Sequence, residues 1–134
     1  MVTATLLPSK KGRDELQQAG LPLAAPVVLR MLIDTGANET SIEEDAIQAW
    51  GLSYSGLGWG SSMGSRRVSL KRYELSVVVS SPNNLASWEI EPLMVTGWKT
   101  RFNNGAYQGC IGRDVLDRAL FVYNGALNNY TLAF

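Results

Sequence analysis

The chain has 134 residues, of which 46% are hydrophobic; 12 basic and 12 acidic residues balance to a formal net charge of zero. This length suits one domain spanning residues 1–134 and is too short for two ordinary ones. Balanced charge without a basic stripe indicates neither a nucleic-acid partner nor an anionic membrane partner. No segment approaches the roughly 20 apolar residues of a membrane-spanning helix, and the N-terminus does not resemble a signal peptide. We therefore expect a cytoplasmic protein.

Histidine is absent and cysteine occurs once, which restricts the possible chemistry. Without histidine, Ser-His-Asp and Cys-His nucleophile systems are excluded, as are nearly all ordinary zinc and non-haem iron sites. Cys110 cannot form an internal disulfide, and its apolar surroundings predict a buried, unreactive thiol. We expect no metal and no cofactor, so any catalysis would rely on carboxylates and water.

The first quarter of the chain predicts two strands separated by an insert. Residues 2–7 alternate threonine with apolar residues, as a short strand does. The insert between Pro8 and Pro26 is polar and then rich in Gly and Pro, with one or two helical turns over residues 13–19. Residues 26–33 are β-branched and apolar almost throughout, which makes them the strongest strand prediction.

The apolar run ends abruptly in Asp34, Thr35 and Gly36. A carboxylate directly after a core strand lies where water is scarce, so its neighbours can tune its proton affinity. Gly36 has no Cβ, which lets the turn bring backbone N–H groups close to that carboxylate. The tripeptide alone is weak evidence, because a turn-capping Asp in an inert β domain would look the same. Ser41-Ile42-Glu43-Glu44 then has capping-box spacing, which predicts a short helix through Trp50.

The middle of the chain predicts a hairpin followed by further strands. Residues 56–64 contain four glycines, and they fit either a mobile hairpin or an ordinary flexible loop. Residues 67–79 alternate apolar and polar positions, with a shift near Arg72 that predicts a bulge. A turn over residues 80–86 and a strand over residues 88–95 follow. Residues 97–109 are expected to form a long loop or a second hairpin.

The last quarter begins with a predicted strand-to-helix corner, Gly109-Cys110-Ile111-Gly112-Arg113-Asp114. Asp114 is a suitable N-cap for a helix over residues 115–119. Two strands, over residues 120–123 and 130–134, close the chain around the hairpin signal Asn124-Gly125. These patterns together predict an all-β fold, mainly strands with one or two short helices.

The order of these features resembles the retropepsins, the retroviral-type aspartic proteases, and most closely their bacterial single-domain members. The motifs that carry the resemblance are Asp34-Thr35-Gly36-Ala37 after an apolar strand, a Gly-rich hairpin, and Ile111-Gly112-Arg113-Asp114 opening a helix. The resemblance implies a closed β-barrel that forms one half of an acid protease. It also implies that residues 56–72 are the flap, with its tip over residues 61–65.

The chemistry implied by the resemblance uses two carboxylates that share one proton and activate a water molecule. Because the chain holds one Asp-Thr-Gly, the second carboxylate would come from a second copy, which implies a homodimeric aspartic endopeptidase acting on a peptide or protein substrate. Residues 131–134 would join an intermolecular sheet. The implied catalytic residues are Asp34, Thr35 and Gly36; the substrate-binding residues are Ala37, Asn38, Trp59, Ser61, Ser62, Met63 and Gly64; and the structural residues are Ile111, Gly112, Arg113 and Asp114.

Some features depart from the family pattern. Asn38 stands where retroviral enzymes carry an Asp that pairs with an arginine, which leaves a role for Arg113 in such a pair open. The insert between Pro8 and Pro26 and the loop over residues 97–109 exceed the compact viral pattern, and they would either line the cleft or brace the dimer. Two alternative functions stay open: a catalytically silent module of this fold that binds peptides or dimerises, and a purely structural β domain.

Overall fold

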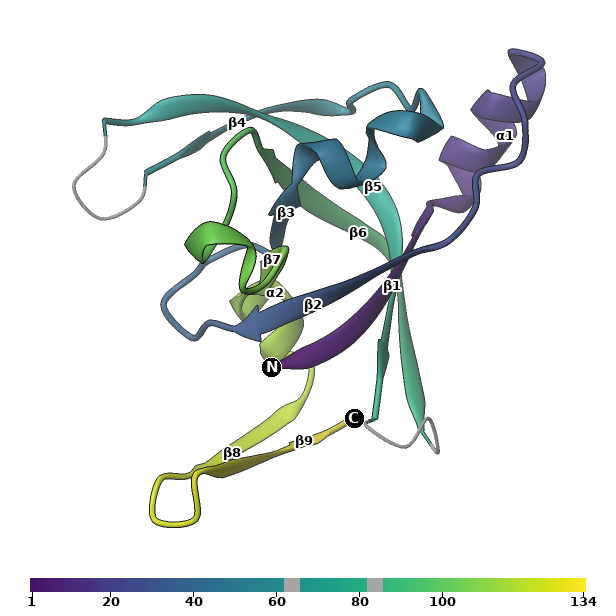
Figure 1. The fold of residues 1–134 in the computed structure, drawn as a ribbon. Helices are drawn as coiled ribbons and strands as arrows, with labels where there is room; N and C mark the ends of the chain where they lie inside the picture. Colours follow the sequence, from purple (N-terminus) through teal and green to yellow (C-terminus); the bar gives the residue numbers. More distant parts are fainter. Residues whose placement is uncertain (62–65, 82–85) are drawn as a thin grey trace.

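The computed structural model describes residues 1–61, 66–81 and 86–134. It is mainly β, with a closed barrel of six strands and a few short helices (Figure 1). The strands are β1 (Val2–Pro8), β2 (Val27–Ile33), β3 (Ser41–Glu43), β4 (Gly56–Gly60), β5 (Val68–Ser80), β6 (Ser87–Trp98), β7 (Gly109–Ile111), β8 (Leu120–Asn124) and β9 (Asn129–Ala133). The helices are α1 (Lys10–Gln18) and α2 (Arg113–Leu116), with 3₁₀ helices η1 (Glu44–Trp50) and η2 (Asn103–Gly105).

The barrel closes because β1 pairs on one side with β2 and on the other with β5. Around the barrel the order is β1-β2-β7-β3-β6-β5. β4 pairs with the first part of β5, on the same edge that pairs with β1 further along and opposite the edge that pairs with β6. Most neighbours are antiparallel, but β2 pairs with β7 and β3 with β6 in parallel. Side chains from nearly every barrel strand fill one hydrophobic core, which includes Leu6, Met31, Ile42, Leu75, Val77, Val95 and Ile111. The prediction of a mainly-β fold is confirmed.

The helix of the insert begins earlier than the sequence predicted. α1 begins at Lys10 instead of Arg13 because the buried side chain of Ser9 is its N-cap and accepts a hydrogen bond from the N–H of Gly12 at 3.1 Å. Ser9 in turn donates to Glu74 on β5 at 2.8 Å. The cap therefore joins the helix to the barrel.

The predicted capping box at Ser41 is wrong. Residues 41–43 form β3, a strand between β6 and β7, and the 3₁₀ helix begins only at Glu44. The hydroxyl of Ser41 shares a hydrogen bond with the thiol of Cys110 at 3.1 Å, so it does not cap a helix. The predicted helix end is confirmed, since Gly51 follows Trp50 in the left-handed conformation at φ 66°.

The bulge predicted near Arg72 lies further along β5. Arg72 is paired regularly with Thr96, and the register shift against β6 falls between Leu75 and Val77. The buried residue between them, Ser76, donates to Glu89 at 2.8 Å. The alternation of apolar and polar residues placed the bulge wrongly because both faces of this part of β5 carry buried residues.

The C-terminal strands β8 and β9 form a separate two-stranded sheet that extends away from the barrel (Figure 1). The connection between them is longer than the predicted Asn124-Gly125 turn, because β9 begins only at Asn129. At the end of the chain, the rings of Phe134 and Trp88 stack with centroids 5.2 Å apart. Across the described ranges, none of the helices has the length and apolar character that crossing a membrane requires.

Candidate active site

Asp34 lies at the carboxyl end of β2, beside the end of β7. The two strands are parallel, with Ile33 opposite Ile111, and the N–H of Asp34 continues the pairing by donating to the carbonyl of Ile111 at 3.0 Å. The apolar run of β2 therefore enters the core and delivers a carboxylate at its end. The side chain of Asp34 is partly exposed, so it is accessible for chemistry.

The turn after Asp34 holds its carboxylate with backbone groups. Oδ1 of Asp34 accepts a hydrogen bond from the N–H of Gly36 at 2.8 Å, and the carbonyl of Asp34 accepts one from Ala37 at 3.2 Å. A Cβ on Gly36 would lie 3.1 Å from Oδ1, which is tighter than most such contacts. Thr35 and Gly36 are both exposed. Glycine thus permits the close approach that the sequence predicted.

The corner at residues 111–114 supports the loop of residues 34–40 between β2 and β3, which we call the Asp34 loop. The N–H of Arg113 donates to the carbonyl of Ala37 at 2.9 Å, and that of Asp114 donates to Asn38 at 3.2 Å. A Cβ on Gly112 would lie 2.5 Å from the carbonyl carbon of Glu39, so only glycine fits there without a shift of the backbone. Two of the three motifs that carry the resemblance, residues 34–37 and residues 111–114, are therefore in direct contact although they are distant in sequence.

A buried network beneath this contact replaces the helix cap that we predicted for Asp114. The prediction is wrong because α2 begins at Arg113 and its N-cap is Gly112. The Asp114 carboxylate instead accepts from the N–H and the hydroxyl of Thr40, both at 2.8 Å. The same hydroxyl accepts from the N–H of Gly112 at 3.1 Å, and Thr40 is fully buried. Thr40 gave no sequence signal, because its partner lies 74 positions further along the chain.

Arg113, whose pairing the sequence left open, pairs with Asn38. Nη2 of Arg113 donates a hydrogen bond to the side-chain oxygen of Asn38. The arginine thus has a neutral amide as partner, and both residues are exposed. The pairing is a hydrogen bond and not an ion pair.

Glu39, which sequence reasoning did not single out, links the loop to two barrel strands. Its carboxylate accepts from Nη2 of Arg72 on β5 at 2.7 Å and from the hydroxyl of Thr96 on β6 at 3.1 Å. Arg72 is paired with Gly56, the first residue of β4. The Asp34 loop is therefore tied to the base of the β4–β5 hairpin.

The hairpin itself has two different faces. A Cβ on Gly58 would meet the side chain of Arg72, and one on Gly60 would meet Leu70 and Trp98. Trp59 alternates with these glycines and therefore lies on the opposite face, 66% exposed, with the guanidinium of Arg67 over its ring at 5.1 Å. Trp59 is thus turned away from the face that contacts Glu39.

Of the remaining predicted substrate-binding residues, the structure describes Ser61, which follows β4 and is exposed. Ser62, Met63 and Gly64, and with them the rest of the predicted flap tip, lie outside the described residues. The structure thus brings residues 34–38 together with residues 111–114, and it does not bring Trp59 to them.

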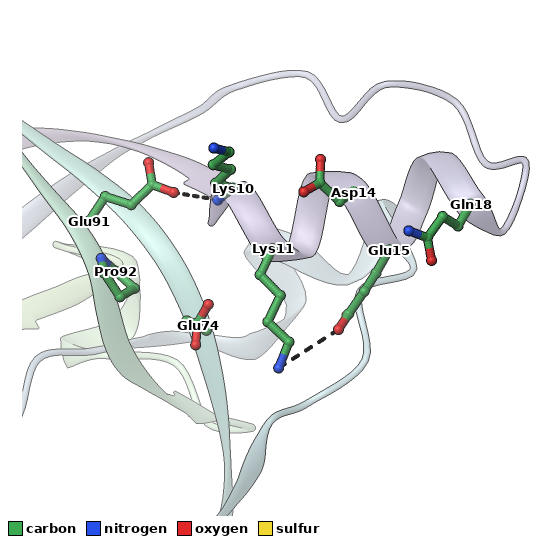
Figure 2. A pocket seen from close by; sticks show the side chains of 8 residues that line it. All are labelled: Lys10, Lys11, Asp14, Glu15, Gln18, Glu74, Glu91 and Pro92. Atoms are coloured by element: carbon green, nitrogen blue, oxygen red, sulfur yellow. Dashed lines mark hydrogen bonds and ion pairs between the residues drawn. The ribbon is translucent and has the colours of Figure 1, made fainter.

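Two hollows in the described part of the surface lie apart from Asp34. The first, of about 490 Å³, is lined by α1, β5 and β6 (Figure 2). In this hollow Glu91 accepts from the backbone N–H of Lys10, and Lys11 pairs with Glu15 at 3.9 Å. The second, of about 450 Å³, lies between η1 and β5. Neither is lined by a residue of the Asp34 loop.

The second hollow contains a carboxylate, Glu44, and a phenol, Tyr73, whose pKa values both depart from their ordinary values. The carboxylate of Glu44 accepts from the hydroxyl of Tyr73 at 2.6 Å and pairs with Lys71 at 3.2 Å. Burial raises the pKa of Glu44, but the hydrogen bonds from Tyr73 and Lys71 outweigh burial and leave it below its usual value. Burial and the adjacent Glu44 raise the pKa of Tyr73 well above its ordinary value. This cluster stabilises the junction of η1 with the barrel.

Cys110 lies on β7, next to β2, and is buried. Burial raises the pKa of its thiol, and the negative charge of Asp34 raises it further, against the opposing hydrogen bond with Ser41. The predicted burial of Cys110 is confirmed. Within residues 1–61, 66–81 and 86–134, no three carboxylate or thiol side chains are grouped as metal ligands would be.

Comparison with known proteins gives no relative: no family model, no curated protein and no solved structure matches this chain.

Proposed function

We propose that the chain is one half of a homodimeric aspartic endopeptidase, with a retropepsin-like fold, in which Asp34 of each copy supplies one carboxylate of the catalytic pair. The observation that carries the proposal is the support of the Asp34 loop. Asp34 ends a core strand, its Oδ1 accepts the N–H of Gly36, and the loop is held by backbone hydrogen bonds from Arg113 and Asp114. This arrangement fixes a carboxylate at the surface, where a second copy can approach it.

The proposed reaction follows from placing two such carboxylates close together. Two carboxyl groups across a short gap cannot both ionise, so they share one proton. The ionised group takes a proton from a water molecule between them, while the protonated group polarises the carbonyl of the peptide bond. Residues 34–36 of the two copies would supply the whole chemistry, and Thr35, which is exposed beside Asp34, would contact the second copy.

The requirement for a second copy is supported by the C-terminal hairpin. Leu120, Val122 and Tyr123 on β8 and Phe134 after β9 are large apolar or aromatic side chains between 48% and 64% exposed. Apolar side chains gathered on a small two-stranded sheet favour a protein partner. In the proposed dimer these strands join an intermolecular sheet.

The experiment compares the wild-type chain with Asp34→Asn, which keeps the shape of the side chain but cannot supply the ionised group. A peptide library is digested between pH 3 and pH 8 while sedimentation measures the oligomeric state. We expect Asp34→Asn to lower cleavage by roughly 10²–10⁴-fold, the usual contribution of a general acid–base, with the dimer intact. Specific activity of the wild type should rise with protein concentration.

Mixing the two chains supplies a further control. An excess of Asp34→Asn should inhibit the wild type, because mixed dimers carry one ionisable carboxylate in place of two. Cleavage by Asp34→Asn at a rate close to that of the wild type, or specific activity that does not change across the monomer–dimer transition, would disprove the proposal.

The exposed apolar side chains of the C-terminal β8–β9 hairpin also fit a second candidate function. In it the chain is a catalytically silent module that dimerises or binds peptides without cutting them. The same experiment separates the two. A stable dimer that binds library peptides or a statine-type inhibitor but cleaves nothing, at any pH tested, favours the silent module.

A further inference from the structure

The segment that contains the β4–β5 hairpin is cationic, although the whole chain is neutral. Residues 52–73 contain four basic residues, Arg66, Arg67, Lys71 and Arg72, and no acidic one. Lys71 is paired with Glu44 and Arg72 with Glu39. Among the described residues no carboxylate pairs with Arg66 or Arg67, and both are exposed. Arg66 and Arg67, just before β5, therefore carry two positive charges that no described carboxylate balances.

Exposed aromatic and apolar side chains lie on one face of the hairpin together with Arg67. Leu57 and Trp59 point the same way because they are two positions apart on β4, and they are 64% and 66% exposed. The guanidinium of Arg67 lies over Trp59 at 5.1 Å, and Nζ of Lys71 lies 5.5 Å from the ring of Tyr54, which is 50% exposed. We call this set, Tyr54, Leu57, Trp59, Arg67 and Lys71, the hairpin face. Tyr, Trp and Arg are the residues most enriched at protein-binding hot spots.

The hairpin face borders an open sheet edge. β4 is the last strand of the seven-stranded sheet, and in the described part of the chain it pairs with β5 alone. The outer edge of such a strand presents N–H and C=O groups that can pair with an extended polypeptide. An extended partner on this edge would place alternate side chains over Leu57 and Trp59.

We propose that the hairpin face is a docking surface for an extended, acidic segment of another protein that also carries an apolar side chain. The acidic character is inferred from Arg66 and Arg67, with which no described carboxylate pairs, and the extended form from the free edge of β4. An apolar side chain of the partner would contact Leu57 and Trp59.

Polypeptide is favoured over the other anionic partners. A nucleic acid is held by many phosphate contacts along a basic stripe. This chain is neutral, and in the described part of the hairpin two of the four basic residues have no paired carboxylate. A membrane surface is bound by an amphipathic helix or a larger basic cluster. A strand edge beside two arginines and a tryptophan matches peptide recognition by strand addition.

The hairpin face is separate from the candidate active site. Arg72 and Leu70, which contact the glycines on the inner face, lie on the side of Glu39 and the Asp34 loop. The docking proposal therefore does not depend on Asp34, and it is tested in the Asp34→Asn chain. Its failure would leave the proposed protease activity untouched.

The test measures binding of a fluorescent ten-residue peptide of alternating Glu and Thr with one central Leu, by fluorescence anisotropy. We expect Arg66→Gln/Arg67→Gln to weaken the affinity about tenfold, because two exposed charge contacts each contribute up to a few-fold. Trp59→Ala should weaken it by a similar factor. Lys10→Gln/Lys11→Gln, which removes the same charge from α1, should change the affinity less than threefold.

Three comparisons can overturn the proposal. A peptide with Gln in place of Glu should bind at least tenfold more weakly, and equal binding would rule out charge recognition. Equal losses in the Arg and Lys variants would show non-specific attraction. Tighter binding of a thymidine oligonucleotide or of phosphatidylserine vesicles than of the acidic peptide, or no peptide binding at all, would also refute it. Circular dichroism checks that each variant is folded.

Discussion

Nη2 of Arg72 lies 2.7 Å from Oε1 of Glu39, and this contact joins the loop of Asp34 to the base of the β4–β5 hairpin. The other oxygen of Glu39 accepts from the hydroxyl of Thr96, so one carboxylate holds both β5 and β6. The side chain of Glu39 is 45% exposed and that of Arg72 is 31% exposed. Solvent screening therefore limits what the pair adds to stability, and its main effect is to fix the loop relative to the hairpin.

We expect Glu39→Ala to lower the free energy of unfolding by about 1 kcal/mol, since it removes one partly exposed ion pair and one hydrogen bond. It should lower the kcat/KM of the proposed protease about tenfold or more, because the loop loses its connection to the hairpin. Urea denaturation and peptide cleavage measure the two effects. Glu15→Ala, which breaks an exposed pair with Lys11 on α1, is the control and should leave both nearly unchanged. Equal effects of the two substitutions would contradict this role.

The close approach of Gly112 to the Asp34 loop predicts that Gly112→Ala destabilises the fold. Its Cβ would lie 2.5 Å and 2.7 Å from the carbonyl carbon and oxygen of Glu39, which are backbone atoms and cannot rotate away. We expect a loss of roughly 2–4 kcal/mol, in the range of severe overpacking. Gly56→Ala is the control, because nothing lies within 4 Å of its Cβ position. Thermal or urea denaturation measures both; a Gly112→Ala protein as stable as Gly56→Ala would show that the loop is not held here.

The hydroxyl of Thr40 should contribute more to the stability of the fold than the shape of its side chain does. Thr40→Val keeps the volume but leaves the Asp114 carboxylate and the N–H of Gly112 each without one hydrogen bond in a buried site. We expect a loss of about 2–3 kcal/mol in urea denaturation. Thr40→Ser retains the hydroxyl and should lose less, and Thr3→Val on the exposed surface of β1 should change stability by under about 0.5 kcal/mol. The prediction fails if Thr40→Val is as stable as Thr40→Ser.

Glu44 predicts a pH dependence of stability with a definite sign. Its pKa is lowered in the folded protein below the ordinary value of 4.5, because hydrogen bonds from Tyr73 and Lys71 outweigh burial, the largest single effect, which acts in the opposite direction. A lowered folded pKa means that the stabilisation is fully present above pH 4.5 and is lost as the pH falls through the folded pKa.

The measurement is urea denaturation of the wild type and of Glu44→Gln between pH 6 and pH 3. The advantage of the wild type should be constant at pH 5.5–6 and shrink toward pH 3. Glu15→Gln, at an exposed position of α1, serves as the control. If the stability advantage of the wild type over Glu44→Gln grows as the pH falls, the pKa of Glu44 is not lowered in the folded protein and the prediction is wrong.

Several strands were predictable because each one is a local pattern. The apolar run before Asp34 became β2, and the alternation after the Gly-rich segment became β5. Helix starts were predicted less well. Ser41 and Asp114 have the side chains of helix caps, yet both bond to groups far away in the sequence, and Gly112 and Glu43 hold the N-cap positions instead. A capping motif shows that a side chain is able to cap a helix, but it does not show which group the side chain hydrogen-bonds in the folded protein.

The sequence by itself determined the chemistry that is possible and the strand that delivers Asp34. The lack of histidine excludes the histidine-dependent nucleophile systems, and the apolar run of β2 places one carboxylate at the edge of the core. Only the tertiary structure decided which residues hold that carboxylate and which way the hairpin faces. Thr40 and Asp114 are 74 positions apart, and Glu39 and Arg72 are 33 apart. Such contacts form where the closed barrel brings distant segments together. The local pattern of apolar and polar residues therefore does not predict them.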